Sequence, residues 1–155
     1  MNQISPAAAG SAAIVEPATW RDLSSLRNLE KICFPRDVWP LLDMVGVLTF
    51  PGVVRLKATR EGEMAGFIAA NLRRTENSAW ISTLGVLPAF RRQGLASTLL
   101  RACEAKLKVP RIRLSVRASN QPALRLYSQF GYKQNGVWSR YYSDGEDALV
   151  LEKSV

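Results

Sequence analysis

The sequence predicts a single α/β domain built on one mixed, mostly antiparallel sheet flanked by helices. Three strand-like segments between residues 53 and 87 are joined by short turns, which is typical of an antiparallel meander. Residues 95–130 then change between helical and strand patterns, and residues 132–142 and 148–153 form a closing hairpin. A strand-helix-strand-helix unit flanked by antiparallel strands favours one mixed sheet.

The first third of the chain predicts one strand and two helices. The segment AAIVEP, residues 12–17, is the first strand, and Thr19 with Asp22 makes a capped start for a helix. A loop around residues 34–36 leads to a second short helix near residues 41–48. The apolar face expected for the first helix consists of Leu26, Leu29 and Ile32.

Two helices and a strand follow the meander. From Leu95 the apolar residues recur at helical spacing, and this helix ends before Pro110. Residues 112–116 are the next strand. Asn120 is the expected N-cap of the second helix, and Gly131 ends it. One face of that helix carries Ala123, Leu126, Tyr127 and Phe130.

The composition is that of a soluble globular protein with a basic surface. The 155 residues are 47% hydrophobic and 22% charged, which suits one domain with one substantial core. Lysine and arginine number 21 against 13 aspartates and glutamates, a net charge of +8. Both a polyanionic partner and a basic fold with solvated charges agree with this excess. No aromatic-rich platform or zinc spacing indicates direct binding of nucleic acid.

Two cysteines, Cys33 and Cys103, lie far apart in a chain without histidine, which argues against a disulfide scaffold and against a metal site. The N-terminus lacks the basic start and apolar core of a signal peptide, and no apolar run is long enough to span a bilayer. We therefore expect a cytoplasmic protein with a flexible N-terminus at residues 1–11 and one domain at residues 12–155.

The segment FRRQGLASTLL, residues 90–100, has the features of an anion site at the start of a helix. A helix N-terminus leaves backbone N–H groups without partners and carries partial positive charge. Gly94 allows close approach to the backbone, Ser97 offers a hydroxyl, and Arg91 and Arg92 add guanidinium groups. The segment matches neither the dinucleotide nor the nucleoside-triphosphate loop. A phosphate seat and a plain glycine turn with surface arginines are both compatible with these residues.

Three segments resemble the GNAT superfamily of N-acetyltransferases. The pattern V-x-P-x-x-R-R-x-G-L-A, residues 86–96, followed by an amphipathic helix, resembles the acetyl-CoA signature of that superfamily. LSVRASNQPALRLYSQFGY, residues 114–132, resembles its next strand and helix. SRYYSDGEDALVLEK, residues 139–153, resembles the C-terminus of the RimI-type protein N-terminal acetyltransferases. The resemblance is close from Val86 to Lys153 and extends to the first half only in the order of elements.

This resemblance implies a GNAT fold, in which the sheet is splayed around acetyl-CoA as cosubstrate and no metal takes part. Backbone groups of Leu84, Gly85 and Val86 would hold the pantetheine arm and acetyl group, and Asn120 matches an asparagine that contacts the arm. The pyrophosphate would lie among the residues of the loop and first helical turn, which are Arg91, Arg92, Gln93, Gly94, Leu95, Ala96 and Ser97.

The resemblance also implies a catalytic role for Tyr127, which matches the family tyrosine beside the thioester sulfur. A phenol there could protonate the departing thiolate. Packing in the core is the alternative role, because Tyr127 lies on the apolar face of its helix. Ser115 departs from the family pattern, since RimI-type enzymes usually have a glutamate, or in one branch a histidine, at this position. Proton removal would then fall to a carboxylate, a tyrosine or water, with Asp37 as one candidate.

Peptide recognition is implied at Phe34, in the loop between the first two helices, and at Tyr141 and Tyr142 of the final hairpin. The expected acceptor is the N-terminal α-amine of a protein, ribosomal proteins included, and the expected enzyme is a monomer that binds neither membrane nor nucleic acid. Three alternatives stay open. They are acetylation of a small amine or a lysine side chain, an acetyl-CoA-binding module without catalysis, and a basic nucleic-acid adaptor.

Overall fold

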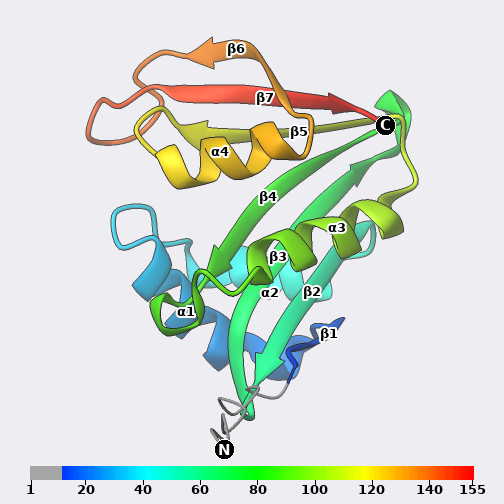
Figure 1. Ribbon diagram of the computed structural model, residues 1–155, viewed down its shortest axis with the longest axis vertical. Helices are drawn as coiled ribbons and strands as arrows, with labels where there is room; N and C mark the ends of the chain where they lie inside the picture. Colours follow the sequence, from blue (N-terminus) through cyan, green and yellow to red (C-terminus); the bar gives the residue numbers. More distant parts are fainter. Residues whose placement is uncertain (1–11) are drawn as a thin grey trace, which may run out of the picture.

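The computed structural model describes residues 12–155, and the flexible segment predicted at residues 1–11 lies outside the described residues. The elements follow in the order β1 (Ile14–Pro17), α1 (Leu23–Cys33), α2 (Leu41–Thr49), β2 (Val53–Arg60), β3 (Glu63–Arg73), β4 (Ser78–Val86), α3 (Leu95–Leu107), β5 (Arg111–Arg117), α4 (Gln121–Gln129), β6 (Lys133–Trp138) and β7 (Ala148–Ser154) (Figure 1). Short 3₁₀ turns lie at Trp20–Asp22, Arg74–Glu76 and Pro88–Phe90.

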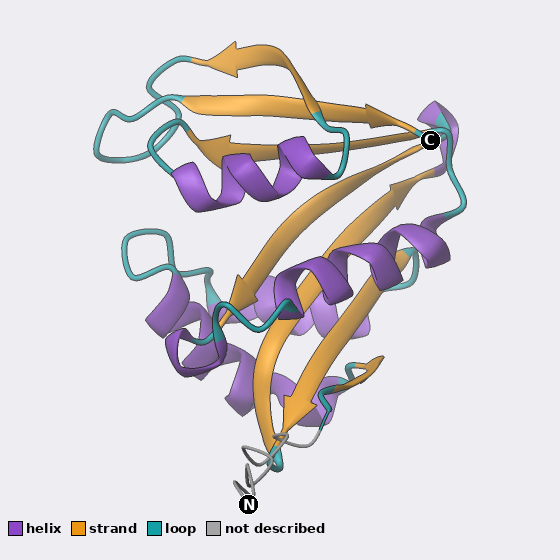
Figure 2. Ribbon diagram, viewed as in Figure 1, coloured by secondary structure: helices purple, strands orange, loops and turns teal. Residues whose placement is uncertain are grey.

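The strands form one sheet in the order β1-β2-β3-β4-β5-β7-β6. All neighbouring strands are antiparallel except β4 and β5, which are parallel. These two pair only from Ser78 to Ile81 on β4 and from Arg111 to Leu114 on β5. Beyond this point the strands diverge, and Figure 2 shows the sheet open like a V between them. The predicted mixed, mostly antiparallel sheet is confirmed, and its two arms enclose a wedge.

Helices cover opposite faces of the β1–β4 arm, and a large apolar core lies under the helices on each face, beside a third, small cluster of Ala65, Val86 and Leu95. α1 and α2 pack on one face, and α3 crosses the other face over β2, β3 and β4 (Figure 1). The core under α1 and α2 includes Leu26, Leu29, Met44 and Phe67. The larger core under α3 extends to α4 and β5 through Leu99, Leu100, Cys103, Ile112 and Tyr127. Burial of this apolar surface is the main force that holds the arms in place.

The start of α1 agrees with its prediction, but its buried face does not. Thr19 and Asp22 form the predicted capping box around the 3₁₀ turn that precedes α1. Ile32, expected on the buried face, is 47% exposed, whereas Glu30 is only 1% exposed. The reason is helical geometry, because a residue four positions after Leu26 lies directly beside it on the buried side. A carboxylate therefore occupies a core position.

The second half of the chain follows its predicted elements, with one difference in the hairpin. Asn120 caps α4 by accepting a hydrogen bond from the Ala123 N–H at 3.2 Å, and Gly131 follows α4 with φ of +91°. β6 ends at Trp138, so Tyr141 and Tyr142 lie in the connection to β7 and not in a strand. From this connection both side chains reach the wedge between β4 and β5.

Candidate active site

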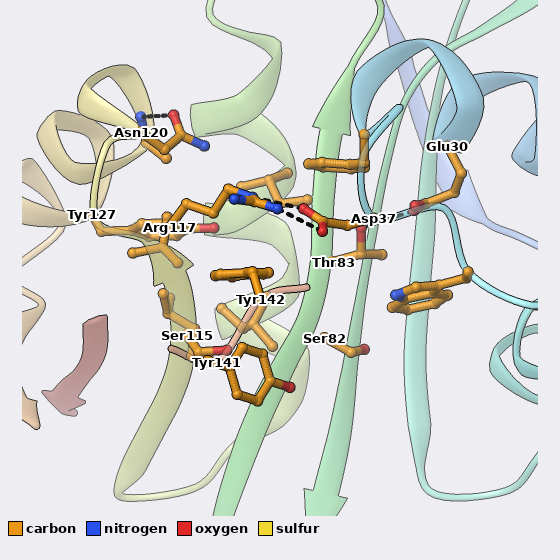
Figure 3. Close-up of a pocket in the computed structure, with 17 residues that line it drawn as sticks. Glu30, Asp37, Ser82, Thr83, Ser115, Arg117, Asn120, Tyr127, Tyr141 and Tyr142 are labelled. Atoms are coloured by element: carbon orange, nitrogen blue, oxygen red, sulfur yellow. Dashed lines mark hydrogen bonds and ion pairs between the residues drawn. The ribbon is translucent and has the colours of Figure 1, made fainter. Parts of the chain in front are cut away.

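A cavity of about 220 Å³ occupies the wedge where β4 and β5 diverge. Both strands contribute to its walls, through Ile81–Leu84 on β4 and Leu114–Arg117 on β5. α1 and the loop after it close one side, and α4 with the β6–β7 connection closes the other (Figure 3). The predicted residues Phe34, Leu84, Asn120, Tyr127, Tyr141 and Tyr142 all line this cavity.

An irregularity in β4 decides which side chains face the cavity from the α1 side. Along β3, Ala69 pairs with Thr83 and the next residue, Ala70, pairs with Ile81, so Ser82 is an extra residue in β4. Such a bulge reverses the alternation of side chains after it. Ile81 accordingly packs in the core under α3, while Thr83 reaches α1 on the opposite face.

Glu30 on α1 is the side chain that Thr83 meets. The Thr83 hydroxyl donates to Glu30 Oε1 at 3.0 Å, and both residues line the cavity (Figure 3). No salt bridge involves Glu30 among residues 12–155. Burial raises the pKa of Glu30 from 4.5 to about 7, and the hydrogen bond from Thr83 only partly opposes this rise. The sequence prediction missed Glu30, although its spacing from Leu26 was a usable signal.

Tyr127 extends from α4 into the cavity with its ring buried. The ring packs edge-on against Tyr132 at 5.5 Å between centroids, and the residue is 6% exposed. In the described part of the chain its hydroxyl makes no hydrogen bond to another side chain or to the backbone. Burial, with a smaller contribution from Cys103, raises the pKa of Tyr127 above its ordinary value. The phenol therefore stays protonated near neutral pH and remains an available donor.

Two other polar residues of the cavity have less capacity for proton removal. Ser115 lines the cavity from β5, and a serine hydroxyl has no useful basicity near neutrality. Asp37, which the sequence suggested as a base, accepts hydrogen bonds on both oxygens from Arg117 at 2.8 Å. The carboxylate of Asp37 is thus engaged in positioning the loop after α1.

Arg117 is the centre of an ionic network at the mouth of the cavity. Besides Asp37, its guanidinium binds Asp144 and Glu146 of the β6–β7 connection, at 2.9 and 2.8 Å. It also lies 4.0 Å from the ring centroid of Tyr142. These contacts tie the loop after α1 to the β6–β7 connection, and they hold the ring of Tyr142 against the mouth.

Stacked aromatic rings extend from this network to the base of the wedge. The Trp80 ring on β4 stacks on Trp138 of β6 at 5.5 Å and 4° between planes. Trp138 contacts Tyr141, which contacts Tyr142, each at 5.0 Å between centroids. The row fixes the β6–β7 connection beside the cavity.

The loop before α3 has the backbone geometry that an anion seat requires. Gly94 is the N-cap of α3 with φ of +77°, and no side chain caps the helix. The N–H groups of the first turn after Gly94 are therefore available, since the first hydrogen bond to the Gly94 carbonyl comes from Thr98. Arg92 is exposed, whereas Arg91 donates through Nε to the Val86 carbonyl at 2.9 Å. The seat fits a phosphate group with Arg92 beside it.

Within residues 12–155, no group of three or more His, Cys, Asp or Glu side chains is placed to hold a metal ion. No helix in that range is long and apolar enough to cross a membrane. Cys33 and Cys103 are both free thiols.

A sheet opened into a wedge, with an anion seat beside it and a buried phenol and carboxyl inside, suits an enzyme that acts on a phosphate-bearing ligand. Residues 23–132 match the model of the Acetyltransferase (GNAT) family, and the chain belongs to this family. The family predicted from the sequence is thereby confirmed.

Relatives agree with this assignment. The chain is 30% identical over 148 residues to the N-terminal acetyltransferase A complex catalytic subunit NAA10 of Arabidopsis thaliana, covering 91% of this chain and 77% of that protein. It is 27% identical over 151 residues to an N-alpha-acetyltransferase of Sulfurisphaera tokodaii, covering 88% and 90%. The crystal structure of the ribosomal-protein-S18-alanine N-acetyltransferase from Escherichia coli superposes with a TM-score of 0.84 at 25% identity, covering 92% and 94% of the two chains.

Proposed function

We propose that the protein transfers an acetyl group from acetyl-CoA to the N-terminal α-amine of a polypeptide. The observation that carries this proposal is the cavity between β4 and β5, which α1 and the loop after it line on one side and α4 with the β6–β7 connection lines on the other. We assign the donor to the side of the α3 turn and the acceptor to the side of α1 and the β6–β7 connection. Relatives named as N-terminal acetyltransferases support the choice of acceptor.

On the donor side, acetyl-CoA supplies an acyl group already activated as a thioester. The first turn of α3 from Gly94 to Ser97, with Arg92, would hold its pyrophosphate. Leu84, Gly85 and Val86 offer backbone groups toward the wedge, since β4 pairs with β5 only as far as Ile81. Asn120 uses its side-chain oxygen as the α4 cap, which leaves its amide nitrogen to donate.

Tyr127 holds the proton that the leaving sulfur needs. Tyr127 lines the cavity, and its phenol is protonated at neutral pH, since the ordinary tyrosine pKa of about 10 is already well above neutrality and burial raises the pKa of Tyr127 further. As the bond between the amine nitrogen and the acyl carbon forms and the carbon–sulfur bond breaks, Tyr127 delivers this proton to the sulfur. The products are an amide and free CoA.

On the acceptor side, the space suits a polypeptide better than a small amine. Trp39 and Ser82 line the cavity and also a second hollow of about 290 Å³ between α2 and the strands. The hollow has apolar walls, among them Leu42, Val47 and Phe50. An acceptor that extends beyond its reacting amine has a continuous surface to follow, past Phe34, Tyr141 and Tyr142.

Proton chemistry favours an α-amine over a lysine side chain. An α-amine with a pKa near 7.7 to 8.0 is roughly a tenth neutral at pH 7, while a lysine with a pKa of about 10.4 is under a thousandth neutral. No histidine exists in the chain to take the proton, so a substrate that is already partly neutral is the better match. Within this proposal the enzyme works as a monomer in the cytoplasm, and N-termini of ribosomal proteins are acceptors to test first.

The test measures CoA release and peptide mass with acetyl-CoA and a panel of peptides with free N-termini. Peptides with a blocked N-terminus and an internal lysine, and simple polyamines, serve as controls. We expect acetylation at the α-amine alone. Products modified only on lysine or only on polyamines would contradict the acceptor class, and acetyl-CoA binding without turnover on any substrate would contradict the enzymatic function.

A further inference from the structure

We propose that Glu30, acting with Thr83 through a water molecule in the cavity, accepts the proton that the acceptor amine loses. This inference rests on the proposed acetyl transfer and assigns its proton acceptor. At position 115, where related enzymes usually have a residue that can act as the base for this step, the chain has a serine. The carboxylate comes from α1 and so from the acceptor side of the wedge (Figure 3).

The burial of Glu30 lacks a structural reason. Its side chain sits in an apolar core position between Leu26 and Cys33 on the same helix face, and it is 1% exposed. Burying a carboxyl group costs free energy unless it is paired and hydrogen-bonded. The partner that the described residues provide is one hydroxyl, from Thr83. An apolar side chain of similar size would pack there with less cost, which points to a functional use of the acid.

The second carboxylate oxygen of Glu30 has no hydrogen-bond partner among residues 12–155, and Glu30 lines the cavity. Oε1 accepts the hydrogen bond from Thr83, and Oε2 has no partner between residues 12 and 155. The one fully buried side-chain nitrogen or oxygen without a partner in that range is Arg55 Nε, so Oε2 is not sealed inside the protein. A cavity of about 220 Å³ has room for a water molecule between Oε2 and a bound amine.

Other titratable groups around the cavity are engaged or unsuitable. Asp37 is bound by Arg117 through both oxygens, and Tyr127 is needed as the proton donor. Tyr142 has a raised pKa, first because of burial and then because of Asp37, so it is a poor base near neutrality. Close to Glu30, Cys33 has a raised pKa through burial and contacts Arg91 at 3.9 Å. Glu30 alone combines a carboxyl group, a free oxygen and a pKa of about 7.

Two protons leave the acceptor nitrogen in the proposed reaction, and each has a named destination. The ammonium form of the acceptor loses an N–H bond, and its proton passes through the water to the Glu30 carboxylate. The neutral nitrogen then forms the bond to the acyl carbon as the carbon–sulfur bond breaks, and the sulfur takes its proton from Tyr127. The second proton that the nitrogen loses on becoming an amide restores the Tyr127 phenol, and Glu30 returns its proton to solvent after the product leaves. An acceptor with a pKa near the working pH suits this transfer.

The test is the pH dependence of kcat/KM for wild type, Glu30→Gln and Thr83→Val, with two peptides whose α-amines differ in pKa. Glutamine keeps the acceptor oxygen for Thr83, so the fold is expected to persist. We expect Glu30→Gln to lower kcat/KM by about 100-fold or more, with the main loss in kcat, and to remove an acidic limb near pH 7 that is shared by both peptides. If a limb of the pH profile shifts between the two peptides, it reports the pKa of the peptide α-amine and not that of Glu30.

Thr83→Val tests the same acidic limb of the pH profile in a second way, because it predicts the direction in which the limb shifts. The Thr83 hydrogen bond lowers the pKa of Glu30, so its loss is expected to move the shared limb to higher pH. Glu152→Gln, which changes an acid bound to Arg113 on β5 and away from the cavity lining, is the matched control with unchanged kcat/KM. A Glu30→Gln enzyme with wild-type kcat/KM and an unaltered shared limb would overturn the role of Glu30 alone. Wild type without N-terminal activity would overturn the proposed function as well.

Discussion

Arg117 on β5 donates two 2.8 Å hydrogen bonds to the carboxylate of Asp37, which lies 80 residues earlier in the loop after α1. Because Arg117 is 8% exposed and also binds the β6–β7 connection, this pair joins the two sides of the cavity mouth. The loops that face the acceptor are therefore held together by the buried guanidinium of Arg117, with a more exposed ion pair between Arg36 and Asp144 at 3.1 Å beside it.

Arg117→Lys is expected to loosen the mouth while leaving the donor side intact. Lysine keeps the charge but loses the planar fork that reaches several carboxylates at once. We expect KM for the peptide to rise roughly tenfold, or about 1.4 kcal/mol, with the acetyl-CoA Kd unchanged. Arg113→Lys, on the same strand but paired with Glu152, is the control with little effect. An equal loss of acetyl-CoA affinity in Arg117→Lys would show a general defect of the fold instead.

Tyr127→Phe is expected to separate catalysis from packing. The Tyr127 hydroxyl has no hydrogen-bond partner within residues 12–155, so its removal leaves the melting temperature nearly unchanged. The loss of a positioned proton donor is expected to lower kcat by roughly 100-fold. Steady-state kinetics and thermal unfolding of the same samples check both parts.

Tyr132→Phe is the matched control for this experiment. The Tyr132 hydroxyl donates to Glu104 at 2.8 Å, and the Tyr132 ring packs against the ring of Tyr127. Its removal is expected to reduce the free energy of unfolding by about 1 kcal/mol and to preserve kcat. If Tyr127→Phe kept full kcat, the role of Tyr127 would be confined to the core.

Gly94→Ala tests the anion seat through binding alone. The φ of +77° at Gly94 is unfavourable for alanine by about 1 kcal/mol, and the added methyl group also stands where a phosphate would approach the backbone. We expect the acetyl-CoA Kd, measured by calorimetry, to rise roughly tenfold.

Gly62→Ala carries the same backbone strain at another place. Gly62 has φ of +74° in the turn between β2 and β3, and a Cβ there meets nothing within 4 Å, as at Gly94. We expect the two variants to lose equal amounts of stability. Only Gly94→Ala is expected to change the Kd for acetyl-CoA. Matching losses of affinity in both variants would remove the evidence for a phosphate seat at α3.

Glu30 is also expected to make stability depend on pH. Its pKa in the folded protein, about 7, is above the ordinary value of 4.5, so the folded state resists ionisation of this group. The free energy of unfolding is then reduced as pH rises from about 4.5 to about 7, by about 3 kcal/mol in total, and levels off above that.

Glu30→Gln removes this particular dependence. Urea unfolding at several pH values is expected to show the variant gaining stability over wild type across that window. Parallel curves for the two proteins would mean that Glu30 ionises normally in the fold.

The regular elements, including the glycine turn that starts α3, were accessible from sequence because short patterns determine them. Gly94 and Pro110 mark the two ends of α3, and Asn120 with Gly131 marks those of α4. The extra residue at Ser82 was not accessible, since every residue around it suits a regular strand. The end of β6 at Trp138, which places Tyr141 and Tyr142 in a loop and not in a strand, was also missed, because the turn that ends β6 has Arg140 with φ of +50°.

The burial of Glu30 lay between these cases. Its spacing from Leu26 places it on the buried face of α1, yet glutamate is almost never fully buried unless it is paired, so an apolar pattern alone does not indicate it. The hydrogen bond from Thr83 is what partly compensates the buried carboxyl group, and this bond depends on the bulge at Ser82 in β4.

The two apolar cores divide the molecule in a way that bears on how such enzymes diversify. α1, α2 and Trp39 of the loop between them pack in the core under α1 and α2, whereas most of α3 and Tyr127 belong to the core that continues to α4. Changes in α2 or in the loop before it can therefore accumulate without disturbing the α4 phenol. Selection on what is acetylated can thus proceed largely apart from selection on what supplies the acetyl group.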